Sequence, residues 1–144
     1  MGSNEVVENI KDFILGGNAE FTLLQEKSER SKRTIQVKYR IKANNNRSCW
    51  FVYTETDNGK MLYRGFLRPD LSFELGKKGR ENLDKDTEYY VNALLWVLNH
   101  KGSLPSEVHI YHHGRCSVCG RKLTDAESLR CGIGPTCRKK IGGR

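Results

Sequence analysis

Four of the five cysteines of this 144-residue chain lie within its last 29 residues, and their spacing suits metal binding. Cys116 and Cys119 are separated by two residues, and Gly120 follows them. A glycine at this place allows the tight backbone turn through which two thiolates reach one ion. Cys137 supplies a further thiol downstream. Because grouped thiolates are typical of structural zinc sites, the sequence predicts Zn²⁺ as a cofactor.

The fourth ligand is open at this point. Eleven residues separate Cys119 from Cys131, so the second half of the site is less regular than the first. A thiol is the softer donor and favours Cys131, whereas the glycine- and proline-containing stretch 132–135 indicates a special turn that could direct this thiol elsewhere. His112 and His113 precede the first cysteine by four and three residues and could also reach the ion. We predict Cys131 as the fourth ligand, with His112 as the alternative.

Disulfide bonds are a poor alternative explanation for these cysteines. Five is an odd number, and the strong clustering does not resemble the framework of a secreted protein. Cys49 adjoins Trp50 and Phe51, and we expect it to be an ordinary buried thiol.

Positive charge is concentrated at the C-terminal end. The formal net charge is +8, and residues 111–144 hold eight Lys or Arg against two acidic residues, while the preceding 110 residues are nearly balanced. A polyanion is the natural partner of such a segment. We therefore predict binding of nucleic acid, DNA or RNA, through cations beside the cysteines: Arg121, Lys122, Arg138, Lys139 and Lys140. The last three are expected on a helix that begins near Cys137.

Residues 1–110 are expected to form an α+β domain, an antiparallel sheet covered by two helices. The first helix is capped by Asn4 and ended by Gly16-Gly17, and the second runs from Thr87 to Lys101 behind an Asp86 cap. Strands are expected at 20–24, 34–42, 48–54, 61–67, 71–75 and 107–111, with an exposed loop at 25–33 and a flexible basic loop at 76–80. Residues 111–144, the C-terminal module, would form a treble-clef or zinc-knuckle-like unit.

Alternation is clearest in the strand at 34–42, where Lys38, Arg40 and Lys42 occupy the polar face. These cations either solvate the outside of the sheet or contact nucleic acid. The aromatic residues of the next two strands either pack in the sheet or stack on bases.

The C-terminal segment resembles a family of small phage and prophage proteins of unknown function, and is similar to a zinc-binding segment appended to some helicase-related proteins. The matching residues are His112-His113-Gly114-Arg115-Cys116, Cys119-Gly120-Arg121, Leu123-Thr124, Ser128, Gly132-Ile133-Gly134-Pro135 and Cys137. Looser likeness covers residues 12–23, 50–52 and 63–65. The resemblance implies a mobile-element origin, a bacterial cytoplasm and a histidine at position 112, and it implies no activity.

Enzymatic patterns are not met. A zinc deaminase needs His-x-Glu upstream of Pro-Cys-x-x-Cys, and no His, Asp or Glu follows Cys137 as a metal-dependent nuclease would require. No apolar run is long enough to span a bilayer, and we expect a soluble cytoplasmic protein without membrane contact. The expected function is non-enzymatic nucleic-acid binding. The alternative is a protein-interaction module that modulates a host defence or nucleic-acid-processing complex.

Overall fold

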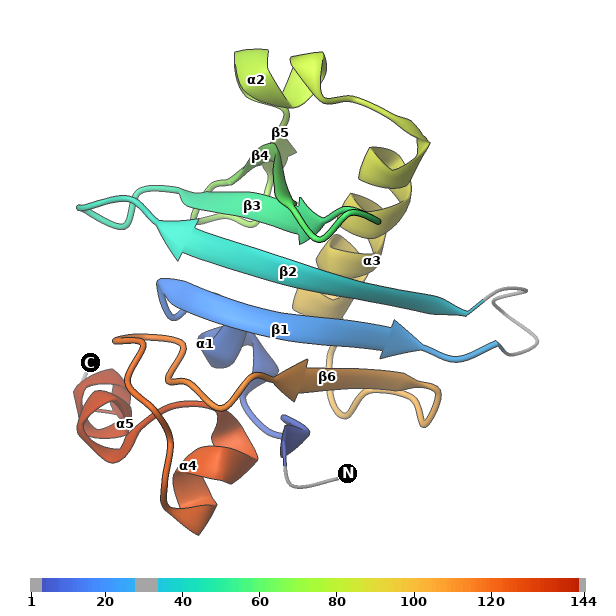
Figure 1. Cartoon of the computed structure of the whole chain (residues 1–144). Helices are drawn as coiled ribbons and strands as arrows, with labels where there is room; N and C mark the ends of the chain where they lie inside the picture. The colour runs from blue at the N-terminus through green and yellow to red at the C-terminus, as the bar shows by residue number, and fades with distance from the viewer. Residues whose placement is uncertain (1–3, 28–33, 143–144) are drawn as a thin grey trace.

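Six strands form one antiparallel sheet in the order β5-β4-β3-β2-β1-β6 (Figure 1). The computed structural model describes residues 4–27 and 34–142, so most of the loop expected at 25–33, and the last two residues of the basic tail, lie outside the described residues. The predicted α+β class with an antiparallel sheet is confirmed. The strands are β1 (Asn18–Gln25), β2 (Ile35–Ala43), β3 (Trp50–Glu55), β4 (Met61–Leu67), β5 (Phe73–Glu74) and β6 (Val108–His112).

One face of the sheet is buried and the other is open. In β2 the predicted alternation holds, with Ile35, Val37, Tyr39 and Ile41 buried while Lys38 and its polar neighbours face outward. Helix α3 (Lys85–Asn99) crosses behind the sheet in Figure 1 and packs on the buried face. The Tyr39 hydroxyl, enclosed there, donates to the Tyr90 carbonyl oxygen at 2.6 Å. On the opposite side, which we call the open face, the helical residues that line a hollow with the strands are those of the first turn of α2 (Gly76–Glu81) beside β4.

The prediction of a long first helix from Asn4 is wrong. Helix α1 spans only Ile10–Ile14, and Asn9 before it has a left-handed backbone. The preceding residues run along the edge strand β6: Glu5 forms a bridge with Tyr111, and the Val6 N–H donates to the Ile110 carbonyl oxygen at 2.8 Å. Free backbone groups at the sheet edge thus outweigh the helical spacing of the apolar residues in this segment.

Two further sequence expectations need correction around α3. Its N-cap is Asp84, not Asp86, because the Asp84 carboxylate accepts both the Thr87 N–H at 2.9 Å and the Arg64 guanidinium at 3.0 Å. Arg64 is almost completely buried, and burial of a guanidinium requires such an anionic partner. The segment expected to be a flexible basic loop is helix α2 (Gly76–Glu81), and Asn82 after it donates to the Tyr63 carbonyl oxygen at 2.9 Å.

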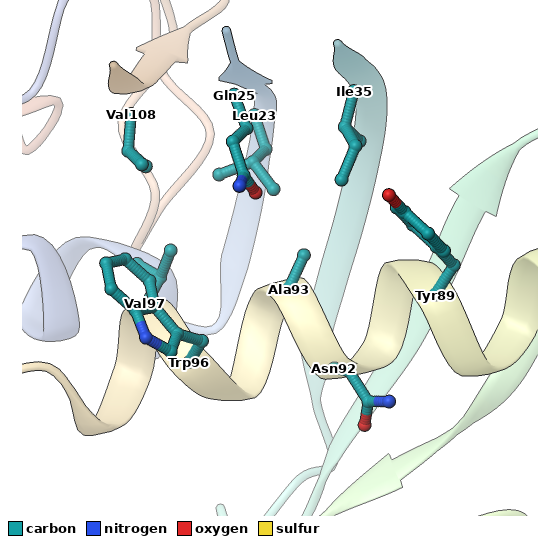
Figure 2. A pocket seen from close by; sticks show the side chains of 9 residues that line it. All are labelled: Leu23, Gln25, Ile35, Tyr89, Asn92, Ala93, Trp96, Val97 and Val108. Carbon is teal, nitrogen blue, oxygen red and sulfur yellow. The ribbon is translucent and has the colours of Figure 1, made fainter. Parts of the chain in front are cut away.

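The layer between α3 and the sheet ends in a cavity of about 400 Å³ (Figure 2). Tyr89, Ala93 and Trp96 of α3 line one side, and the ends of β1, β2 and β6 line the other. The described lining is apolar, aromatic or amide, without a carboxylate, cation or thiol. It therefore lacks the grouped ionisable side chains that mark a catalytic or metal site.

The C-terminal module folds against the end of the sheet where β6 finishes and β1 begins (Figure 1). It contains α4 (Ala126–Cys131) and α5 (Pro135–Gly142), of which only the helix near Cys137 was expected. The described part of residues 1–110 holds three helices where two were expected. The expected boundary at 110/111 falls inside β6. Cys116, Leu123 and Ile133 are buried in the same core as Phe13 and the sheet. The module is thus packed on the domain through a continuous apolar contact.

Candidate metal centre

The side chains of Cys116, Cys119 and Cys137 form a thiol triad in which all three sulfur atoms lie within 4.8 Å of one another. Tetrahedral zinc with Zn–S bonds of about 2.3 Å requires sulfur atoms about 3.8 Å apart. The spacing therefore suits one metal ion. Local structure sets it: the Gly120 N–H donates to the Cys116 carbonyl oxygen at 2.9 Å and closes the turn, and α5 carries Cys137 in its first turn.

Backbone N–H groups point at the sulfur of Cys116. Gly134 donates to this atom at 3.2 Å and Val118 at 3.4 Å. Burial of Cys116 disfavours its thiolate, but these hydrogen bonds and that of the Cys119 N–H outweigh burial and lower the pKa of the thiol. Burial first, and then the neighbouring thiols, raise the pKa of Cys137 to about 12. Three thiolates in this space therefore need a bound cation, which is what a metal supplies.

The turn that carries the first two thiols is fastened to the start of β1. The Asn18 backbone N–H donates to the Ser117 carbonyl oxygen at 2.6 Å, and the Asn18 side-chain amide donates to the Val118 carbonyl oxygen at 2.7 Å. The Ser117 N–H in turn donates to the Gly132 carbonyl oxygen at 3.0 Å. These bonds hold the triad by the sheet, a role of Asn18 that no sequence motif indicates.

Cys131, the predicted fourth ligand, is not part of the triad among the residues described. It is the last residue of α4, and its thiol donates to the Ile133 carbonyl oxygen at 3.4 Å. The Arg138 guanidinium lies 3.6 Å from its sulfur. The thiol is therefore held in contacts between α4 and α5.

His112, the alternative ligand, is buried with both ring nitrogens engaged by backbone groups. Nδ1 accepts the Gly114 N–H at 2.9 Å, so the proton is on Nε2, which donates to the Leu129 carbonyl oxygen at 2.6 Å. The ring thus ties β6 to α4 and has no free nitrogen for a metal. Nε2 of His113 lies 2.9 Å from Thr22 Oγ1 on β1.

Arg138, predicted to contact nucleic acid, forms hydrogen bonds and ion pairs with other residues of the module. One of its nitrogens donates to Ser128 Oγ at 2.9 Å and to the Ile133 carbonyl oxygen at 3.0 Å. The other lies 3.8 Å from Asp125 and 3.6 Å from Glu127. Asp125 also caps α4 by accepting the Ser128 N–H at 3.0 Å. Sequence reasoning missed this cap, although the Asp-x-x-Ser spacing ahead of a short helix indicates it.

The other predicted cations of the module are exposed. Arg121, Lys122 and Lys140 line, together with the triad, a hollow of about 310 Å³, and Lys139 projects from the surface of α5. On the open face, Lys42 is exposed, Lys38 lies 3.9 Å from Glu55, and Arg40 is paired with Glu20 at 2.8 Å. Cations of the module therefore gather around the thiol triad, whereas the cations of β2 lie on the open face of the sheet.

Within the described residues, no helix combines the length and apolar character that crossing a lipid bilayer takes. The model of DUF6011, a family of unknown function, matches residues 107–142, about a quarter of the chain. The match covers β6, the thiol triad and both helices of the module. No curated protein and no solved structure matches the chain.

Proposed function

We propose that this chain is a non-catalytic protein in which Zn²⁺, held by the thiol triad, orders a basic surface that binds nucleic acid. The observation that carries the proposal is the shared hollow: Arg121 and Lys122 from the turn, and Lys140 from α5, surround the triad. Zinc suits three thiolates because it is a borderline-soft ion without redox chemistry of its own. Cys116, Cys119 and Cys137 would hold it and so fix the start of α5.

The negative charge of the zinc-loaded centre is too small to neutralise all of the surrounding cations. Three thiolates and one Zn²⁺ sum to a charge of about −1 in simple formal terms, which one neighbouring cation offsets. Because Arg138 is engaged inside the module, the cations predicted to contact nucleic acid that remain exposed there are Arg121, Lys122, Lys139 and Lys140. The remaining positive charge is suited to phosphate groups, which attract cations irrespective of base sequence. The likeness of the segment to phage and prophage proteins is compatible with a role on the nucleic acid of a mobile element.

A salt series tests the proposal. The logarithm of the binding constant for duplex DNA falls with the logarithm of salt concentration by about 0.9 for each phosphate contact, so four cations give a slope of about −3 to −4. Replacing Arg121, Lys122, Lys139 and Lys140 by Gln should abolish most of this slope. The matched control replaces four exposed lysines outside the module, Lys11, Lys27, Lys85 and Lys101, by Gln and should keep it.

Both variants are compared with the unmodified chain after zinc loading, and thermal unfolding shows whether each is folded. An unchanged slope in the module variant would refute the proposal, as would absence of binding at low salt. The second result would direct attention to a protein partner, which the sequence also suggested.

A further inference from the structure

The open face carries a cluster of four aromatic side chains on the neighbouring strands β3 and β4. Phe51 and Tyr53 come from β3, and Tyr63 and Phe66 come from β4; we call them the aromatic cluster. The rings of Tyr53 and Tyr63 have centroids 5.4 Å apart in an edge-to-face arrangement, and those of Phe51 and Tyr63 are 6.2 Å apart. All four side chains are half-buried. They therefore present ring surface to solvent.

A β-bulge brings the cluster together. Side chains three positions apart in a regular strand point to opposite faces, yet Tyr63 and Phe66 line the same hollow. The register shift between Val52 and Tyr53 leaves Arg64 unpaired, and this residue turns to the buried face to meet Asp84 and Thr87. An extra residue of this kind redirects the side chains beyond it. Burial of Arg64 thus fixes both aromatic side chains of β4 on the open face.

Cations border the aromatic cluster. Lys77 and Lys78 of α2 line the same hollow, whose volume is about 530 Å³. Lys42 is the cross-strand neighbour of Phe51 on the same face. Asn82 positions α2 through its bond to the Tyr63 carbonyl oxygen. The described lining contains aromatic, glycine and lysine residues without a carboxylate, so its charge complements an anion.

From this combination we infer that the aromatic cluster binds unpaired bases of single-stranded nucleic acid, with Lys77, Lys78 and Lys42 at the phosphates. Rings that expose a face stack on bases of any sequence, and flanking cations follow the backbone. In a duplex the faces of the bases are covered by neighbouring base pairs, so they cannot stack on the aromatic rings. The inference rests on the proposed function, in that the chain binds nucleic acid, and it adds a second surface that selects the single-stranded form.

The experiment compares an oligothymidylate with a DNA duplex of equal length at one salt concentration. Tyr53→Leu/Tyr63→Leu removes both phenol rings but keeps apolar bulk. Tyr53→Phe/Tyr63→Phe keeps the ring faces and is the matched control. The Leu variant should lose about tenfold in affinity for the oligothymidylate, as expected for the loss of one or two stacked bases, and should bind the duplex as before. The Phe variant should behave as the unmodified chain.

A third variant, carrying Gln at the four module cations, separates this inference from the proposed function. If it loses duplex binding while the Leu variant binds both probes normally, the proposed function stands and the inference falls. Equal loss of both probes in the Leu variant would also overturn the inference, since the loss would not depend on unpaired bases. If the unmodified chain binds neither probe, both are refuted. As an independent readout, photocrosslinking of an oligonucleotide that contains 5-iodouracil should label Tyr53 or Tyr63, identified by mass spectrometry.

Discussion

A comparison of Cys131 with Cys137 tests most directly which cysteines bind the metal. The spacing in the sequence predicts that both residues bind zinc, whereas of the two only Cys137 belongs to the thiol triad in the structure. We expect Cys131→Ser to bind zinc as tightly as the unmodified chain, and Cys137→Ser to bind it far more weakly. The two substitutions exchange the same atoms, sulfur for oxygen, in the same module.

The expected magnitudes follow from the contacts of each thiol. Structural zinc sites of peptides bind with about 10–16 kcal/mol, so an even division over three thiolates assigns about 3–5 kcal/mol to each. Cys137→Ser should therefore weaken zinc binding by about two to three and a half orders of magnitude. In Cys131→Ser the hydroxyl can still donate to the Ile133 carbonyl oxygen, so we expect a stability change below about 1 kcal/mol.

The assay is a competition titration with a chromogenic zinc chelator, accompanied by thermal unfolding with and without the metal. The unmodified chain and Cys131→Ser should bind one zinc per chain with the same competition curve. Comparable losses in the two serine variants would show that Cys131 turns inward to complete the site on metal binding, and would refute the argument from its contacts. X-ray absorption of the zinc-loaded chain gives the sulfur count independently: three sulfur ligands are expected, with a lighter atom in the fourth position.

Further substitutions at Gly132, Asp84 and Asp125 test the contacts that hold the fold together. Gly132→Ala should cost more than about 2 kcal/mol in urea unfolding, because its φ of 74° strains an alanine and the new methyl group would lie 2.5 Å from the Phe13 ring. Gly120→Ala is the control: its φ is 80° but the space around it is open, so it should cost only about 1 kcal/mol. Asp84→Ala should cost about 2–4 kcal/mol in urea unfolding, since it removes a helix cap and the anionic partner of the buried Arg64. Asp84→Asn can still cap the helix and should cost less. Equal costs for the two variants would contradict this explanation. The hydroxyl and backbone N–H of Ser128 lower the pKa of Asp125, so its contribution to stability is complete above the unfolded value of about 3.9 and is lost as the pH falls through the lower folded pKa. Acid unfolding of Asp125→Asn should lack this component, and an identical acid profile for the two proteins would refute the assignment.

Sequence patterns predicted the parts of the molecule that depend on local spacing. The alternation over β2 identified its buried face, and the two-residue gap between Cys116 and Cys119 identified the turn of the metal centre. In both cases the relevant distance is set by a few bonds of one segment. The start of a helix at Cys137 was predicted within two residues for the same reason.

Features that depend on distant contacts were not predictable in this way. Cys131 has the right chemistry for zinc, but Arg138 and the Ile133 carbonyl hold its thiol between two helices. Arg138 looks like a surface cation in the sequence because its partners lie on another helix. The aromatic cluster depends on a bulge around Arg64, whose cause is a carboxylate twenty positions later in the chain. A periodicity of two cannot reveal such an exception.

The short extended segment before α1 has a practical consequence. Glu5 and Val6 pair with β6, which is otherwise the outermost strand of the sheet. An uncovered edge strand is a template on which a second chain can add, and such pairing is a common route to aggregation. Trimming the chain at residue 9 to shorten an apparently irregular start would remove this cover. Preparations shortened there should be checked for self-association before any loss of binding is attributed to the metal centre.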